Sequence, residues 1–146
     1  MLKKIYNQKN AFSLLEIIFA IAIMAIIAVV AIPKFNNTLT NTNKIKIKSD
    51  ILLIREGLQN HKNKMILSNN NNSLNSLDNG TLLFNKILQH PILTSSEQKA
   101  TSWSKQSNQK YLVWIDSTNK LEFTYDKSNY TFDCDIKNNY CKELTQ

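Results

Sequence analysis

The pattern of hydrophobic and polar positions divides the chain into two unlike parts. From Phe12 to Ile32 the sequence reads FSLLEIIFAIAIMAIIAVVAI, in which 19 of 21 residues are apolar. A helix of that length spans about 31 Å, the hydrocarbon thickness of a bilayer. The run therefore predicts a membrane-spanning helix. Pro33 should kink or end it, because its ring would clash with the carbonyl of Val29.

Beyond Pro33, apolar residues return mostly at steps of three and four. This spacing predicts an amphipathic helix over about 36–67 that continues the first helix outward. The opposite face carries Asn, Lys and Thr, so we expect the apolar stripe to pack against a sheet. The stripe consists of Phe35, Leu39, Ile47, Ile51, Ile54, Leu58 and Met65.

Residues 68–109 carry weaker signals. Residues 68–80, SNNNNSLNSLDNG, are of low complexity and predict a loop. Residues 81–93 predict a short helix broken before Pro91. Residues 94–109 are polar, with Trp103 as the expected hydrophobic anchor.

Three strand-like runs follow at 110–116, 120–127 and 129–136, each rich in aromatic and β-branched residues or alternating with a period of two. Short polar corners separate them, which favours an antiparallel meander with one face on the helix. The expected fold class is α+β: a long N-terminal helix packed on a small C-terminal antiparallel sheet.

Composition excludes several function classes. The two glycines of the chain, Gly57 and Gly80, are too few and too far apart for a glycine-rich phosphate loop. His61 and His90 are expected on the surface, because neither has a neighbouring Ser, Cys or Asp arrangement typical of nucleophilic catalysis. Eighteen Lys and Arg against eleven Asp and Glu give a net charge of +7, which leaves binding of nucleic acid or anionic lipid open.

Acidic residues cluster near the last strands. Asp126, Asp133 and Asp135 could contribute carboxylate oxygens to a calcium site. The sequence shows no recognisable calcium loop there, and acids beside lysines are more typical of a solvated face. We therefore expect neither a metal nor a cofactor.

The basic leader MLKKIYNQKNA precedes the apolar run and should stay on the cytoplasmic side of a membrane. A cleaved secretory signal is the first alternative, but its apolar region is usually shorter and a small-residue cleavage site follows it. Glu16 does not fit a plain anchor. Its carboxylate either stays hydrated near the interface or meets a positive partner at the same depth.

The leader, the small Ala11 and the following FSLLE resemble the signature of type IV pilins and pseudopilins. The resemblance implies that a membrane peptidase cleaves between Ala11 and Phe12 and methylates the new Phe12 amine. It also implies that Glu16 is the assembly carboxylate, which meets the amino terminus of a neighbouring subunit. Pro33 matches a proline common in these helices. Ala11 stands where Gly is usual, and Ala25 where many members carry a helix-loosening Gly.

This resemblance implies a prepilin leader at 1–11, a transmembrane and assembly helix at 12–33 and a periplasmic pilin-like domain at 34–146. The implied function is that of a structural, non-catalytic subunit of a type IV pilus-like filament or a type II secretion pseudopilus. Its partners would be its own copies, other pilin-like subunits, prepilin peptidase, the inner-membrane assembly platform and membrane lipid. A minor subunit with a binding role such as DNA uptake is the alternative, and a membrane-anchored periplasmic enzyme is the rival from a different class.

Cys134 and Cys141 enclose six residues near the C terminus. In an oxidising compartment a disulfide is the default state, and many type IV pilins staple their C-terminal region in this way. Closing so short a loop should contribute about 2.5 kcal/mol in the chain-entropy model. Two free or reactive thiols are the alternative.

Overall fold

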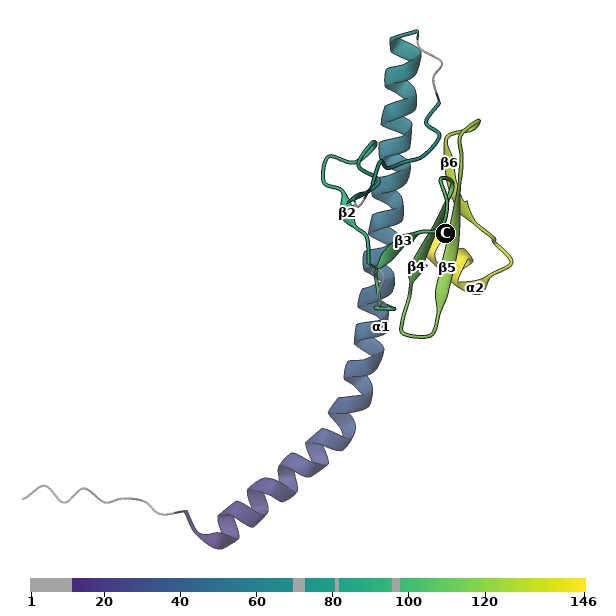
Figure 1. Cartoon of the computed structure of the whole chain (residues 1–146). Coiled ribbons are helices and arrows are strands. Elements are labelled where there is room, and N and C mark those ends of the chain that lie inside the picture. The colour runs from purple at the N-terminus through teal and green to yellow at the C-terminus, as the bar shows by residue number, and fades with distance from the viewer. Residues whose placement is uncertain (1–11, 70–72, 81, 96–97) are drawn as a thin grey trace, which may run out of the picture. The chain divides into compact units, whose positions relative to one another are not determined.

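The computed structural model describes residues 12–69, 73–80, 82–95 and 98–146 (Figure 1). It divides into two units, one ending at Thr38 and the other running from Leu39 to Gln146, and helix α1 (Leu14–Leu67) contributes to both. The expected helix through residue 67 is confirmed. Helical backbone continues past Pro33, so the expectation that this proline could end the helix is wrong, whereas a kink stays a prediction.

Within the N-terminal unit, residues Leu14–Ile32 have a mean hydropathy of 3.0 and form a helix long and apolar enough to cross a membrane. The Ser13 carbonyl accepts hydrogen bonds from the amides of Glu16 at 3.0 Å and Ile17 at 3.2 Å, and these close the first turn. None of this 19-residue span is buried inside the protein, as expected for a surface that faces lipid or other helices.

The C-terminal unit contains a four-stranded antiparallel sheet in the order β3-β4-β5-β6. The three predicted strands are confirmed with shorter ends, as β4 (Lys110–Trp114), β5 (Lys120–Asp126) and β6 (Thr131–Cys134). Strand β3 (Trp103–Lys105) was not predicted, because its three residues lie in a polar stretch. In Figure 1 the sheet lies beside the second half of α1.

The apolar stripe of α1 supplies the helical side of the core. Leu39 is 47% exposed and Met65 is only partly buried, so the buried stripe is shorter along the helix than the sequence pattern predicts. The side chain of Phe35 lies outside the described residues. The confirmed part, which is at most 1% exposed, consists of Ile47, Ile51, Ile54 and Leu58.

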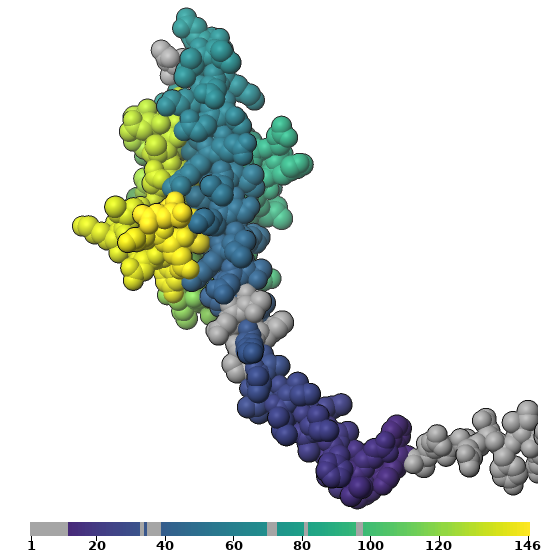
Figure 2. All heavy atoms as spheres, turned by 180° about the vertical axis from the view of Figure 1, so that it is seen from behind, coloured from purple at the N-terminus to yellow at the C-terminus, as the bar shows by residue number. Residues whose placement is uncertain are grey.

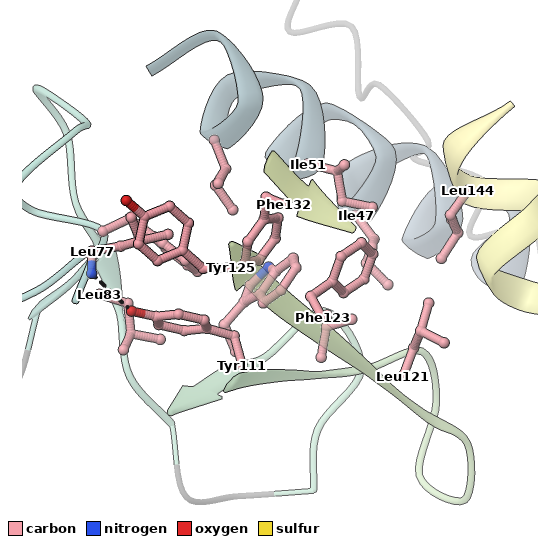
Figure 3. Packing of buried hydrophobic residues seen from close by; sticks show 14 of the residues in the cluster. Ile47, Ile51, Leu77, Leu83, Tyr111, Leu121, Phe123, Tyr125, Phe132 and Leu144 are labelled. Atoms are coloured by element: carbon pink, nitrogen blue, oxygen red, sulfur yellow. Dashed lines mark hydrogen bonds between the residues drawn. The ribbon is translucent and has the colours of Figure 1, made fainter. Parts of the chain in front are cut away.

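Opposite this stripe lies a cluster of buried aromatic rings (Figure 3). Phe123 of β5 stacks on Phe132 of β6, with ring centroids 5.0 Å apart and planes inclined by 11°. Trp103 is fully buried, which confirms its role as an anchor, and meets Phe84 edge-on at 5.7 Å. Such offset and edge-on contacts add to the free energy gained by burying the rings.

The short helix expected at 81–93 is wrong. Strand β1 (Leu82–Leu83) instead pairs antiparallel with β2 (Ile92–Leu93) around a turn. Phe84 begins this turn with a left-handed backbone, at φ 61°, which a right-handed helix cannot contain. Full burial of the Phe84 ring in the core accompanies this conformation, so tertiary packing overrides the local helical preference.

A second helix, α2 (Asn139–Thr145), ends the chain and was not predicted. The Asn138 side chain caps it by accepting a hydrogen bond from the amide of Tyr140 at 2.9 Å. Leu144 is buried in the core, and Lys44 of α1 pairs with Glu143 at 2.8 Å. These contacts hold α2 on the second half of α1.

Candidate functional site

Phe12, just before α1, and Glu16, in its first turn, lie on one side of the N-terminal unit. Phe12 lies two residues before the first residue of α1, yet both side chains line the same hollow. Together with the apolar residues one and two turns further on, they line a shallow hollow. Its lining residues are Phe12, Glu16, Ile17, Ala20, Ile21 and Met24. Ala11 lies outside the described residues, so the expected cleavage bond is not placed.

Glu16 is the only charged residue between Phe12 and Ile32. Its position in the first turn is favourable, because the exposed amides at a helix N-terminus attract negative charge. It nevertheless forms no ion pair with any residue in the described ranges. A carboxylate within a membrane helix costs on the order of 3 kcal/mol at the bilayer centre and less near the interface. Among the described residues, the hollow therefore presents a carboxylate without an ionic partner on an apolar surface.

Comparison with protein families identifies a known motif in the segment that carries this hollow. Residues 6–32 match the family described as the prokaryotic N-terminal methylation motif. The chain carries the prepilin-type signature of type IV pilins and pseudopilins. Comparison with curated proteins and with solved structures gives no significant match.

The prepilin-type signature covers the N-terminal segment, and the remainder of the chain has an α+β, pilin-like layout. The signature supports a pilin-like or pseudopilin protein that prepilin peptidase processes. It points to a structural subunit rather than an enzyme, and it implies assembly with other pilin subunits. Together with the apolar helix, it also supports membrane anchoring.

The two cysteines of the chain form a disulfide in the structure. Cys134 ends β6 and Cys141 lies in α2, with their Cα atoms 5.8 Å apart. Cys141 is 1% exposed and belongs to the hydrophobic core. The bridge therefore fastens the C-terminal helix to the last strand of the sheet.

The three aspartates considered for calcium serve separate local roles. The Asp126 carboxylate accepts hydrogen bonds from the Ser128 amide at 2.8 Å and from Asn129 Nδ2 at 2.7 Å. These hydrogen bonds lower the pKa of the Asp126 carboxyl. Asp133 pairs with Arg55 of α1 at 2.5 Å, whereas Asp135 accepts from a backbone amide two residues on. Within the part of the chain that the structure describes, no group of three metal-ligating side chains comes together.

The two histidines differ in their surroundings. His90 is exposed as expected, whereas His61 is partly buried, so the surface expectation is wrong for His61. Burial, followed by the positive charge of Lys64, lowers the pKa of His61. Its ring lies 6.3 Å from that of Tyr130, and its buried Nε2 has no hydrogen-bond partner among the described residues.

Sequence reasoning missed a buried polar network in the stretch expected to be a plain loop. Asp78 is 2% exposed and accepts from Lys105 Nζ and from the Tyr111 hydroxyl, both at 2.7 Å. The same hydroxyl accepts from the Leu77 amide at 3.1 Å, the contact dashed in Figure 3. Burial above all raises the pKa of Tyr111 well beyond its usual range. The network fastens the loop to the sheet.

Proposed function

We propose that the chain is a structural subunit of a type IV pilus-like filament or a type II secretion pseudopilus. Prepilin peptidase cleaves it between Ala11 and Phe12 and methylates Phe12, and the mature subunit assembles through the apolar part of α1. The match of residues 6–32 to the methylation motif carries this proposal, and the lone Glu16 on an apolar helix supports it.

The physical basis is the cost of isolated charge in an apolar bundle. Cleavage creates a cationic amine at Phe12, four residues before Glu16. When helices of neighbouring subunits pack, the amine of one can lie beside the Glu16 carboxylate of the next. Pairing offsets a desolvation cost that neither charge could bear alone. Because only one axial stagger brings the two groups together, the pair also sets the register between subunits.

The proposed topology follows from the charges flanking the helix. Lys3, Lys4 and Lys9 precede the apolar run, and no acid accompanies them. This excess holds the leader on the cytoplasmic side of the inner membrane and leaves residues 34–146 in the periplasm. The helix at 12–33 then spans the lipid until the assembly platform extracts the subunit into a filament.

Substitution of Glu16 tests the proposal. We expect Glu16→Leu and Glu16→Gln to insert and to be processed like the parent protein, with residues 1–11 lost and Phe12 N-methylated in mass spectrometry. Incorporation into sheared filaments and crosslinking between subunits should collapse in both variants, because neither side chain is anionic. Glu56→Gln is the matched control, since Glu56 lies on α1 beyond the apolar run. Normal assembly of Glu16→Leu, or a mature protein that keeps residues 1–11, would overturn the proposal.

A further inference from the structure

The tip of the β5–β6 hairpin meets the last turns of α1 around a cavity of about 340 Å³. Figure 2 shows the hairpin tip, in yellow-green, against the teal end of the helix. The cavity combines cationic, hydroxyl, apolar and aromatic side chains, a mixture that differs from the apolar core beneath. The residues that matter for recognition are Lys62, Met65, Ser73, Lys127, Ser128 and Tyr130.

Positive charge in this cavity is not neutralised locally. Neither Lys62 nor Lys127 forms an ion pair with a residue in the described ranges. The carboxylate nearest in sequence, Asp126, accepts from the Ser128 amide at 2.8 Å and from Asn129 Nδ2 at 2.7 Å. These hydrogen bonds engage both carboxylate oxygens of Asp126 within the turn. The two ammonium groups are therefore available to an anion.

Tyr130 supplies the aromatic wall. Its backbone is left-handed, at φ 58°, a conformation that is uncommon and costly for a bulky residue. The partly buried ring lies 6.3 Å from the His61 ring and 6.0 Å from Lys62 Nζ, so packing on α1 accompanies the strained turn. Residues with a strained backbone persist only where the surrounding structure holds them in place. They cluster at active sites and ligand sites.

We propose that this cavity binds a nucleotide unit, with its phosphate between Lys62 and Lys127 and its base against the ring of Tyr130. Ser73 and Ser128 provide hydroxyl groups for phosphate or sugar oxygens. Sites for single-stranded nucleic acid combine such a cationic track with an aromatic platform. The cavity volume lies at the small end of the range for ligand sites, which suits one nucleotide rather than a larger cofactor. The chemistry is shared by a free nucleotide and by one residue of a strand.

Fluorescence anisotropy on the full chain in non-ionic detergent tests this proposal, with fluorescein-labelled oligothymidine as the probe. We expect Lys62→Gln/Lys127→Gln to weaken binding about tenfold and to reduce the slope of log K against log salt by about 0.7, the value for one phosphate contact on a single strand. Lys99→Gln/Lys137→Gln removes the same charge from exposed positions outside the cavity and should change the affinity less than about twofold.

The aromatic contact is tested separately. Tyr130→Leu should weaken binding at least about fivefold through lost stacking, whereas Tyr130→Phe keeps the ring and should bind like the parent protein. Competition by thymidine monophosphate would support a free nucleotide, and competition by unlabelled oligothymidine alone would support a strand. Equal competition by inorganic phosphate, equal losses in the two double-lysine variants, or full binding by Tyr130→Leu would each overturn the proposal. Because binding is measured on unassembled chain, its failure leaves the proposed assembly role untouched.

Discussion

The buried ion pair between Asp78 and Lys105 should be a main support of the C-terminal unit. The Asp78 side chain is fully buried, and the Lys105 side chain is 28% exposed. Lys105→Met would leave a buried carboxylate with the Tyr111 hydroxyl as its remaining side-chain donor among the described residues. Removing one partner of a buried pair costs about 3–5 kcal/mol. The partial exposure of Lys105 places the expected loss of unfolding free energy near the lower figure.

Urea unfolding of the full chain in detergent, followed by tryptophan fluorescence, measures this loss. Lys110→Met is a matched control, because Lys110 and Glu122 also pair at 2.7 Å but are 52% and 46% exposed. That exposed pair should contribute less than about 1 kcal/mol. Asp78→Asn/Lys105→Met removes both charges and should be more stable than Lys105→Met alone. Equal losses in Lys105→Met and Lys110→Met, or a double variant less stable than Lys105→Met, would refute the reasoning.

Three further outcomes follow from local geometry. Gly57→Ala should destabilise the protein by about 1–3 kcal/mol in urea, although Ala favours helix, because its Cβ would lie 2.7 Å from the carbonyl oxygen of Ile87. The lowered pKa of His61 means that the unfolded chain binds a proton more readily than the folded chain, so the unfolding free energy of the parent protein falls as pH drops below about 6.5. His61→Gln should make the unfolding free energy less dependent on pH in this range. Cys134→Ser/Cys141→Ser should cost about 2.5 kcal/mol by the same assay, and an unchanged midpoint would contradict a structural role.

The elements predicted correctly are those whose burial follows a regular period. The stripe from Ile47 to Leu58 repeats at helical spacing, and Leu121, Phe123 and Tyr125 alternate along β5. In both cases one face packs on the core, so periodicity reports the burial directly. The prepilin-type signature could also be recognised from the sequence, because a basic leader, FSLLE and an apolar run lie together in the first 32 residues.

The elements that sequence reasoning missed depend on contacts between distant residues. Asp78 lies in an asparagine-rich stretch typical of a loop, and its burial becomes intelligible only beside Lys105 and Tyr111, which are at least 27 residues away. Phe84 belongs to a locally helical pattern but turns the chain with a positive φ into the aromatic core. Local propensity contains no information about the distant residues that contact Asp78 and Phe84, so it gives the wrong expectation at these two positions.

Helix α1 divides its surface between two physical tasks. Its side chains from Leu14 to Ile32 contribute nothing to the buried core, whereas those of Ile47, Ile51, Ile54 and Leu58 are almost fully enclosed by the sheet side of the C-terminal unit. A substitution in the first set therefore leaves the folding core intact and alters only what the helix meets outside its own chain. Because Glu16 belongs to that set, loss of assembly without loss of unfolding free energy is the signature that separates an assembly carboxylate from a structural one.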